Sequence, residues 1–267
     1  MTPGRWTLPD LSSALARCEE QNLQGISCTL HVLDEYARTA EEADTVSAAY
    51  REAISGIARN GLDASVSVKL SSLGALHDGD AAMERTLDLC READHNRVGF
   101  EIDMEGKGLV GAAIESAGLC RKGNWPVILA LQAYLYRSTG DLRIFLALGI
   151  TPRFVKGAYH GDISDFSGVE QRFLDLVRDA YRSEVPFHIG THDPVLLQEI
   201  LSLAADRKDR IQFGFLFGLA DRTKQEMAAD GWQVSEYIPY GTGAEAYVAR
   251  RERYIRELDS LGRQPVP

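Results

Sequence analysis

Charged and polar residues interrupt several apolar segments of this chain, and their types suggest a binding site for an anion. In the segment RFVKGAY, Arg153 and Lys156 flank the apolar pair Phe154 and Val155. Burying an unpaired cation is costly, so a buried strand that carries two cations needs anionic groups nearby. Similar interruptions occur at Lys69, Asp103, Gln132, Thr191, His192, Gln212 and Tyr237.

The side chains of this set are mainly cations and amide or hydroxyl groups, and Asp103 is its one carboxylate. Arg binds carboxylate or phosphate through two parallel hydrogen bonds, whereas Lys acts as a point charge. The set therefore suits an anionic ligand near Lys69 and a phosphate-bearing cofactor near Arg153 and Lys156.

A second cationic group, YVARR, contains the adjacent residues Arg250 and Arg251. On a helix their side chains point about 100° apart, so they could hold a carboxylate from two sides, and Tyr247 shares their face. Taken alone, this charged stretch would be typical of a solvent-exposed helix face. Together with the strand residues, it indicates a ligand site.

Strands and helices that could position these residues alternate along the chain. The predicted strands are nearly continuous in apolar residues, as in a parallel sheet covered on both faces. They are 25–33, 65–72, 98–105, 126–134, 153–159, 187–192, 211–218 and 234–241. The predicted helices are about 10–23, 43–61, 80–95, 108–123, 141–149, 169–183, 195–207, 221–230 and 244–258.

Eight strand–helix units after one N-terminal helix predict an α/β fold, a (β/α)8 barrel formed by residues 1–267 as a single domain. A doubly wound parallel sheet is the alternative. Catalytic groups of such barrels lie at the C-terminal ends of the strands, where the polar residues named above are expected.

Composition excludes several other classes of protein. A net charge of -10 and a pI near 5.1 leave no basic face for nucleic acid. We find no apolar run long enough to span a membrane and no secretory signal at the N-terminus. None of the four cysteines forms a C-x-x-C pair, which favours reduced thiols in a cytoplasmic protein. No metal site is expected, since His188 and His192 would lie roughly 13 Å apart on a strand.

Taken together, these motifs resemble those of the proline dehydrogenase family. The matching segments, in the order of the family, are VSVKLSSLG, FEIDMEG, LQAYLYR, RFVKGAY, THD, YIPYG and YVARR. Each motif is weak alone, but Tyr237 followed thirteen residues later by Arg250 and Arg251 is specific. The resemblance implies a distorted (β/α)8 barrel, with the last helix over its mouth, that binds FAD non-covalently.

The implied reaction is the oxidation of L-proline to Δ1-pyrroline-5-carboxylate. In the family, a hydride passes from the ring carbon next to nitrogen to flavin N5, and the electrons then pass to a quinone. A quinone acceptor implies a cytoplasmic protein that can contact the inner face of the membrane peripherally.

Individual roles also follow from the resemblance. The substrate residues it implies are Lys69, Asp103, Tyr159, Tyr237, Arg250 and Arg251, with Glu35 pairing with Arg250 to close the site. The cofactor-binding residues it implies are Gln132, Arg153, Val155, Lys156, Gly157, Ala158, Thr191, His192 and Gln212. Gly157 and Ala158 would be small to let the cofactor approach the backbone.

The chain departs from the family pattern at several positions near these sites. His31 and Asp34 replace the aspartate and glycine of the first-strand motif, and Asp193 ends a motif that usually reads THN. Tyr254 stands where the family has a glutamate that contacts the flavin, so we expect looser retention of FAD. His160 also differs from the usual residues. Because these changes lie near the site, a dehydrogenase whose substrate is another cyclic or secondary amine is an alternative.

Two further alternatives concern the same barrel. A Schiff-base aldolase would use Lys156 or Lys69 as its nucleophile. A binding protein without turnover would hold a flavin or an amino acid. The presence of Asp103, Tyr237 and the arginine pair argues against the second alternative.

Overall fold

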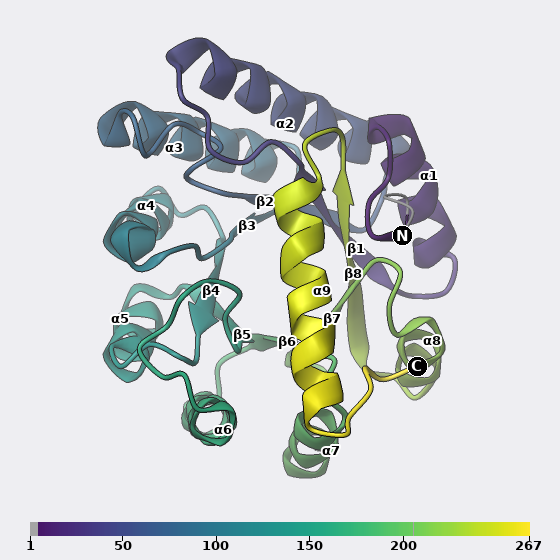
Figure 1. The fold of residues 1–267 in the computed structure, drawn as a ribbon. Helices are drawn as coiled ribbons and strands as arrows, with labels where there is room; N and C mark the ends of the chain where they lie inside the picture. The colour runs from purple at the N-terminus through teal and green to yellow at the C-terminus, as the bar shows by residue number, and fades with distance from the viewer. Residues whose placement is uncertain (1–4, 205) are drawn as a thin grey trace.

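The protein, seen in a computed structural model, forms a barrel of parallel strands surrounded by helices (Figure 1). The structure describes residues 5–204 and 206–267. Within them the strands run in chain order around the barrel, and β1 pairs with β8 to close it. The strands are β1 Ser27–Val32, β2 Ala64–Val68, β3 Gly99–Ile102, β4 Ile128–Gln132, β5 Thr151–Val155, β6 Phe187–Gly190, β7 Ile211–Leu216 and β8 Gln233–Tyr240.

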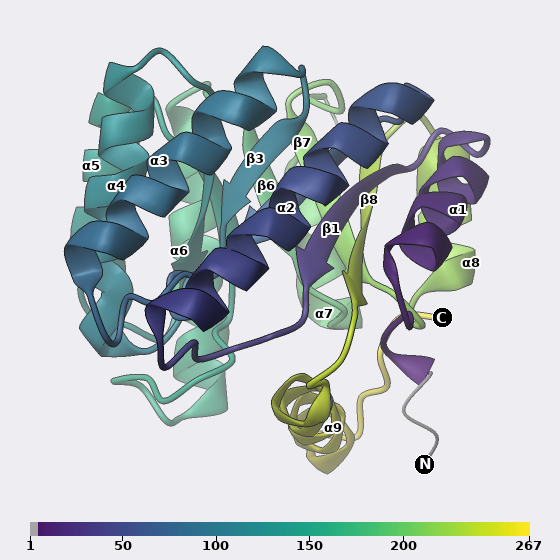
Figure 2. The same cartoon turned by 90° about the horizontal axis from the view of Figure 1, so that it is seen from above.

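The helices follow the strands in alternation, as predicted, so the barrel is confirmed and the doubly wound alternative is wrong. They are α1 Leu11–Asn22, α2 Ala40–Asn60, α3 Gly79–His95, α4 Val110–Lys122, α5 Ser138–Leu148, α6 Phe166–Arg182, α7 Pro194–Leu203, α8 Asp221–Ala229 and α9 Glu245–Ser260, with a short 3-10 turn at Lys107–Leu109. In Figure 2, α9 lies apart from the ring of outer helices and crosses one end of the barrel.

Several strands end earlier than the sequence predicted. The second was expected to reach residue 72 and the fifth residue 159, but they end at Val68 and Val155. Lys69 and Lys156 therefore follow their strands directly and begin the loops at the barrel mouth. Residues 1–4, at the start of the segment judged to lack a secretory signal, and residue 205, in the predicted helix 195–207, lie outside the described residues.

Side-chain caps set the starts of several helices. Asp10, Thr39, Asp78, Asp165 and Asp193 have extended backbone conformations, and their side-chain oxygens accept hydrogen bonds from backbone N–H groups of the first helical turn. Such caps satisfy donors that have no partner within the helix.

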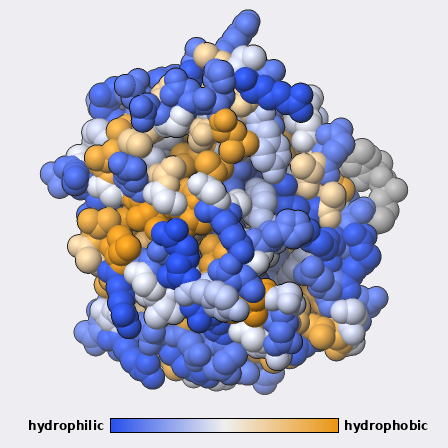
Figure 3. Space-filling view, turned by 60° about the vertical axis from the view of Figure 1, so that its left-hand side comes forward, coloured by the Kyte–Doolittle hydropathy of each residue, from blue (hydrophilic) through white to orange (hydrophobic). Residues whose placement is uncertain are grey.

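The hydrophobic core fills the layer between strands and helices. Ile54 of α2, Phe145 of α5 and Phe173 of α6 are fully buried there. On the face in Figure 3, hydrophilic residues surround a group of hydrophobic ones.

A buried charge cluster fixes α1 and α8 to the outside of β8. The carboxylate of Glu236 accepts two hydrogen bonds from Arg17 of α1, at 2.7 and 3.0 Å, and one from Lys224 of α8. Glu236 and Lys224 are almost completely buried. Removing one partner of such a buried pair leaves a charge that is only partly compensated.

We expect Lys224→Met to lower the free energy of unfolding by about 3 kcal/mol, because Arg17 alone must then balance the buried Glu236 carboxylate. Urea denaturation measures this. Lys122→Met removes an exposed lysine at the end of α4 and should change stability by less than about 0.5 kcal/mol. Equal stabilities for the two variants would show that Arg17 is sufficient.

Candidate active site

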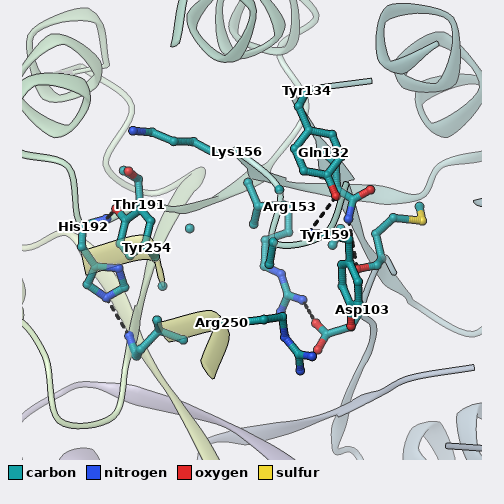
Figure 4. Close-up of a pocket in the computed structure, with 18 of the residues that line it drawn as sticks. Asp103, Gln132, Tyr134, Arg153, Lys156, Tyr159, Thr191, His192, Arg250 and Tyr254 are labelled. Atoms are coloured by element: carbon teal, nitrogen blue, oxygen red, sulfur yellow. Dashed lines mark hydrogen bonds and ion pairs between the residues drawn. The ribbon is translucent and has the colours of Figure 1, made fainter. Parts of the chain in front are cut away.

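A cavity of about 560 Å³ lies at the C-terminal ends of the strands, between them and α9 (Figure 4). Its volume is within the range of small-molecule and cofactor sites. The predicted site residues that line it are Lys69, Asp103, Gln132, Arg153, Val155, Lys156, Gly157, Ala158, Tyr159, Thr191, His192, Tyr237, Arg250 and Arg251. The sequence motifs thus converge on one space.

Two predicted residues lie outside this lining. Glu35 is next to it, with Oε1 2.8 Å from Lys69 Nζ and in an ion pair with Arg250. Gln212 is the second residue of β7, far from the strand's C-terminal end, and its amide donates to Ser27 Oγ at 3.2 Å. The structure therefore does not bring Gln212 to the predicted cofactor site.

Arg153 lies in the middle of β5 and points into the barrel, where it forms ion pairs with Glu101 and Asp103 (Figure 4). These carboxylates are the anionic groups that the sequence of this strand required. The expectation that Asp103 is the one inner carboxylate was wrong, since Glu101 is also buried. Glu101 was missed although it stands two residues before Asp103, a spacing that places both on one face of a strand.

Asp103 connects three other groups of the site. Burial alone would raise the pKa of its carboxyl, but the positive charges of Arg153 and Lys69 hold this pKa below its ordinary value. Tyr237 donates its phenol hydrogen to Asp103 Oδ2 at 2.6 Å, and Lys69 Nζ lies 3.8 Å from the same oxygen. The orientation of the Tyr237 ring is therefore fixed by an ionised acid.

His31 holds Lys69 from the other side. Lys69 Nζ donates to His31 Nε2 at 2.7 Å, and His31 Nδ1 lies 3.0 Å from the carbonyl oxygen of Ser67. The ring is fully buried, and burial together with the Lys69 charge lowers the pKa of His31 to about 3. His31 is therefore neutral, and the proton on Nδ1 leaves Nε2 free to accept the hydrogen bond from Lys69. At this position the family has an aspartate, so a neutral acceptor replaces an anionic one.

The two arginines of α9 have different environments. Arg250 forms the expected ion pair with Glu35 and lies over the ring of Tyr159. Arg251 lies over the ring of Tyr247, and its Nε is buried without a hydrogen-bond partner among the described residues. Arg251 is thus the guanidinium that is available to a ligand.

The cations of this part of the site are not equally compensated. Lys69, Arg153 and Arg250 form ion pairs with Glu35, Glu101 and Asp103, and Glu105 is buried nearby. Arg251 lines the cavity with a buried Nε that has no partner among the described residues, which suits a ligand with a carboxylate.

Gly157 is also required by a neighbouring side chain, and its predicted role in cofactor approach stays a prediction. Its φ is +123°, and a Cβ there would lie 1.8 Å from the ring of Tyr134. The small residue therefore makes room for Tyr134, whose hydroxyl accepts a hydrogen bond from the backbone N–H of Tyr159 at 3.1 Å. Tyr134 lines the cavity and was not among the predicted site residues, although it lies within the LQAYLYR segment.

His192 and Tyr254 form another wall of the cavity. His192 Nε2 accepts a hydrogen bond from the backbone N–H of Leu216 at 2.9 Å, and burial lowers the pKa of this histidine to about 3. The hydroxyl of Tyr254 accepts from the backbone N–H of His192 at 3.3 Å. Tyr254 therefore packs on the barrel where the family has an acid.

The lining fits a flavin dinucleotide. Gln132 Oε1 is buried and has no partner among the described residues, whereas its Nε2 donates to the carbonyl oxygens of Met104 and Glu105. A carbonyl oxygen free in this way can accept a hydrogen bond from a flavin ring. Apolar and aromatic side chains complete the walls, as at Met104, Tyr134, Phe215 and Leu216.

The family model described as proline dehydrogenase matches residues 14–162, more than half of the chain. The chain belongs to the proline dehydrogenase family. Proline dehydrogenase 1 of Bacillus subtilis (strain 168) is 28% identical over 248 residues, which are 90% of this chain and 82% of that protein. Proline dehydrogenase of Deinococcus radiodurans is 28% identical over 257 residues, with the same coverage.

Solved structures share the fold. Proline utilization A of Bdellovibrio bacteriovorus, inactivated by N-propargylglycine, superposes with a TM-score of 0.83 at 17% identity. The superposition covers 93% of this chain and 32% of that one. The predicted family, fold and enzyme class are confirmed for this proline dehydrogenase. Within the described residues, no helix is both long and apolar enough to cross a membrane.

The neutral state of His31 predicts a loss of stability in acid. Its pKa is about 3 in the folded protein and about 6.5 in the unfolded chain. Below pH 6.5 the unfolded chain therefore binds a proton that the folded protein does not, and stability falls with pH down to about 3. This histidine should contribute about 1.4 kcal/mol per pH unit within that window.

Urea denaturation at pH 6 and pH 4.5 measures this contribution. His31→Gln should reduce the slope of the free energy of unfolding against pH by the amount that corresponds to about one proton. His77→Gln, at an exposed residue, should not change this slope. An unchanged slope in His31→Gln would show that other buried groups cause the acid sensitivity.

Proposed function

We propose that this proline dehydrogenase oxidises L-proline to Δ1-pyrroline-5-carboxylate with non-covalently bound FAD, and that residues 1–267 form one catalytic domain. The observation that supports this best is the unpartnered guanidinium nitrogen of Arg251 in the same cavity as the Tyr237–Asp103 pair. It suits the carboxylate of an amino acid whose ring packs on the phenol. When bound, FAD supplies the hydride acceptor, flavin N5, and a quinone then takes the electrons.

The residues of the chain bind and orient the substrate. Arg251 binds the carboxylate directly, and Arg250 and Lys69 add positive charge from the side of Glu35. Tyr237, held by Asp103, packs against the ring and limits its rotation. Gln132 ends β4 and Arg153 lies in β5, next to Asp103, and both line the cavity where they would contact the flavin.

The helix α9 excludes water from the reacting carbon. Its residues Arg250 and Arg253 bind Glu35 and the carbonyl oxygen of Ala158, which belong to loops on different sides of the mouth. Tyr254 adds a third contact, with the backbone of His192. A covered site protects hydride transfer from competing reactions with solvent.

The ion pairs of the two lysines argue against a Schiff-base aldolase. Such a nucleophile must be a neutral amine. Lys69 Nζ lies 2.8 Å from Glu35 Oε1, and Lys156 Nζ lies 2.7 Å from Asp193 Oδ2. Each amine is thus in contact with a carboxylate, although burial lowers the pKa of Lys156.

Two measurements on the purified protein test the proposal. Heat release and chromatography should yield FAD, in a sample supplied with the cofactor. Under anaerobic conditions, proline should then bleach the flavin absorbance faster than 4-hydroxyproline or pipecolate. Faster bleaching by another cyclic amine would assign that amine as the substrate, and recovery of FMN alone or of no flavin would overturn the cofactor assignment.

We expect Arg251→Lys to lower kcat/KM for proline, which corresponds to a loss of about 2–4 kcal/mol of transition-state stabilisation. The charge is kept, but a lysine cannot form the two parallel hydrogen bonds to a carboxylate. Steady-state kinetics with a dye acceptor measure this. Arg256→Lys, on the exposed side of α9, is the matched control and should retain the activity of the unmodified enzyme. Near-normal activity of Arg251→Lys would remove this residue from the substrate site.

A further inference from the structure

Four charged residues form a closed cluster at the side of the cavity between α6 and α7, and we call it the charge quartet. Lys156 Nζ lies 2.7 Å from Asp193 Oδ2 and 3.5 Å from Glu170 Oε1. Arg263 Nη1 lies 3.0 Å from Asp193 Oδ2 and also pairs with Glu170. Each carboxylate of the quartet therefore contacts both cations.

The members of the quartet come from distant parts of the chain. Lys156 directly follows β5, Glu170 lies in α6, Asp193 caps α7 and Arg263 follows α9. The segment 262–267 crosses from the end of α9 past α7 toward α8 (Figure 1). It is fixed by hydrogen bonds from Val266 N to His192 O at 3.0 Å and from Thr223 N to Pro267 O at 2.8 Å.

Only part of the quartet faces the cavity. Lys156 lines it together with Phe166, whose ring lies 4.0 Å from Lys156 Nζ, whereas Glu170, Asp193 and Arg263 are not part of the lining. In Figure 4, Lys156 points away from Asp103 and Arg250, so it marks the end of the cavity opposite the substrate residues. A flavin between these ends would bring its phosphates toward Lys156.

The balance of charge at this end depends on Arg263. Burial alone would raise the pKa of Asp193, but the hydrogen bond and charge of Lys156 hold it below its ordinary value, so Asp193 is an anion. Without Arg263, the carboxylates of Asp193 and Glu170 would outweigh the one ammonium of Lys156. A phosphate would then meet a net negative charge close to its binding position.

We propose that Arg263 is a positioning residue of the cofactor site: it neutralises Asp193 and Glu170 and so leaves the Lys156 ammonium able to bind the phosphates of a dinucleotide. This inference rests on the proposed use of FAD. It assigns a role to a residue outside the motifs that carry the family resemblance, and it explains how an acid is tolerated at position 193.

A purely structural role is the competing explanation. The quartet could act as a clasp that holds the segment 262–267 on the barrel, with no effect on a ligand. The two roles differ in what they predict for ligands with and without phosphate. ADP carries the phosphates without the flavin ring, and riboflavin carries the ring without phosphates.

The test measures the dissociation constants of ADP, FAD and riboflavin for protein stripped of flavin. Arg263→Gln should weaken the binding of ADP and FAD by about tenfold to a hundredfold, the effect of one uncompensated charge at close range, and change riboflavin binding less than about twofold. Arg263→Lys should stay close to the unmodified protein because it keeps the charge. Arg256→Gln removes an equal charge from the exposed side of α9 and should have no effect on any ligand.

Charge complementation makes the test specific. The double variant Asp193→Asn with Arg263→Gln has a quartet without excess negative charge, and asparagine can still cap α7. It should bind ADP within about threefold of the unmodified protein, since each tenfold corresponds to 1.4 kcal/mol. The melting temperature of each ligand-free variant shows whether the segment 262–267 remains in place.

Three results would overturn the inference: an unchanged affinity of Arg263→Gln for ADP, an equal loss for riboflavin and ADP, or no recovery in the double variant. A lower melting temperature with unchanged ADP affinity would identify the clasp. Failure of the unmodified protein to bind FAD would refute the proposed cofactor, whereas the ADP series would still decide the role of Arg263.

Discussion

The ion pairs of Arg153 inside the barrel are the interaction on which the rest of the site depends. A guanidinium in the middle of a buried strand is stable only with partners close by. Glu101 of β3 and Asp103, which directly follows β3, supply them from two strands away in the closed parallel barrel. An open sheet would not bring these side chains together in this way.

The consequences of that pairing extend to the substrate side through Asp103. Because this carboxyl stays ionised, it can accept hydrogen bonds from Tyr237 and attract Lys69 at once. Lys69 then contacts Glu35, and Glu35 holds Arg250 of α9. A continuous series of charged contacts thus links the barrel interior to the helix over its mouth, so the position of α9 depends on the same charges that bind a carboxylate.

The sequence predicted the barrel and most of the lining of the cavity. The C-terminal ends of parallel strands all lie at one end of a barrel, and Lys69 and Gln132 stand at such strand ends. It did not predict which charges compensate each other. Glu101 shares a strand face with Asp103, but the sequence does not show that Arg153 is its partner. Arg263 reaches the site only through tertiary packing, and its spacing from the motifs carries no signal of that packing. The contact of Gly157 with Tyr134 also depends on tertiary packing, which a linear motif cannot show. Gln212 lies near the start of β7, so the strand keeps its side chain away from the barrel mouth.

Two departures from the family pattern change the charge at opposite ends of the cavity. At the substrate end, the neutral His31 takes the place of an acid, so Lys69 contacts a neutral acceptor where the family has a carboxylate. At the other end, Asp193 adds a negative charge that Lys156 and Arg263 share. Since charges in a low-dielectric site act over several ångströms, each change alters the attraction of its end of the cavity for an anionic ligand. The two departures are therefore best understood together with the residues around them, as a redistribution of charge along one binding cavity.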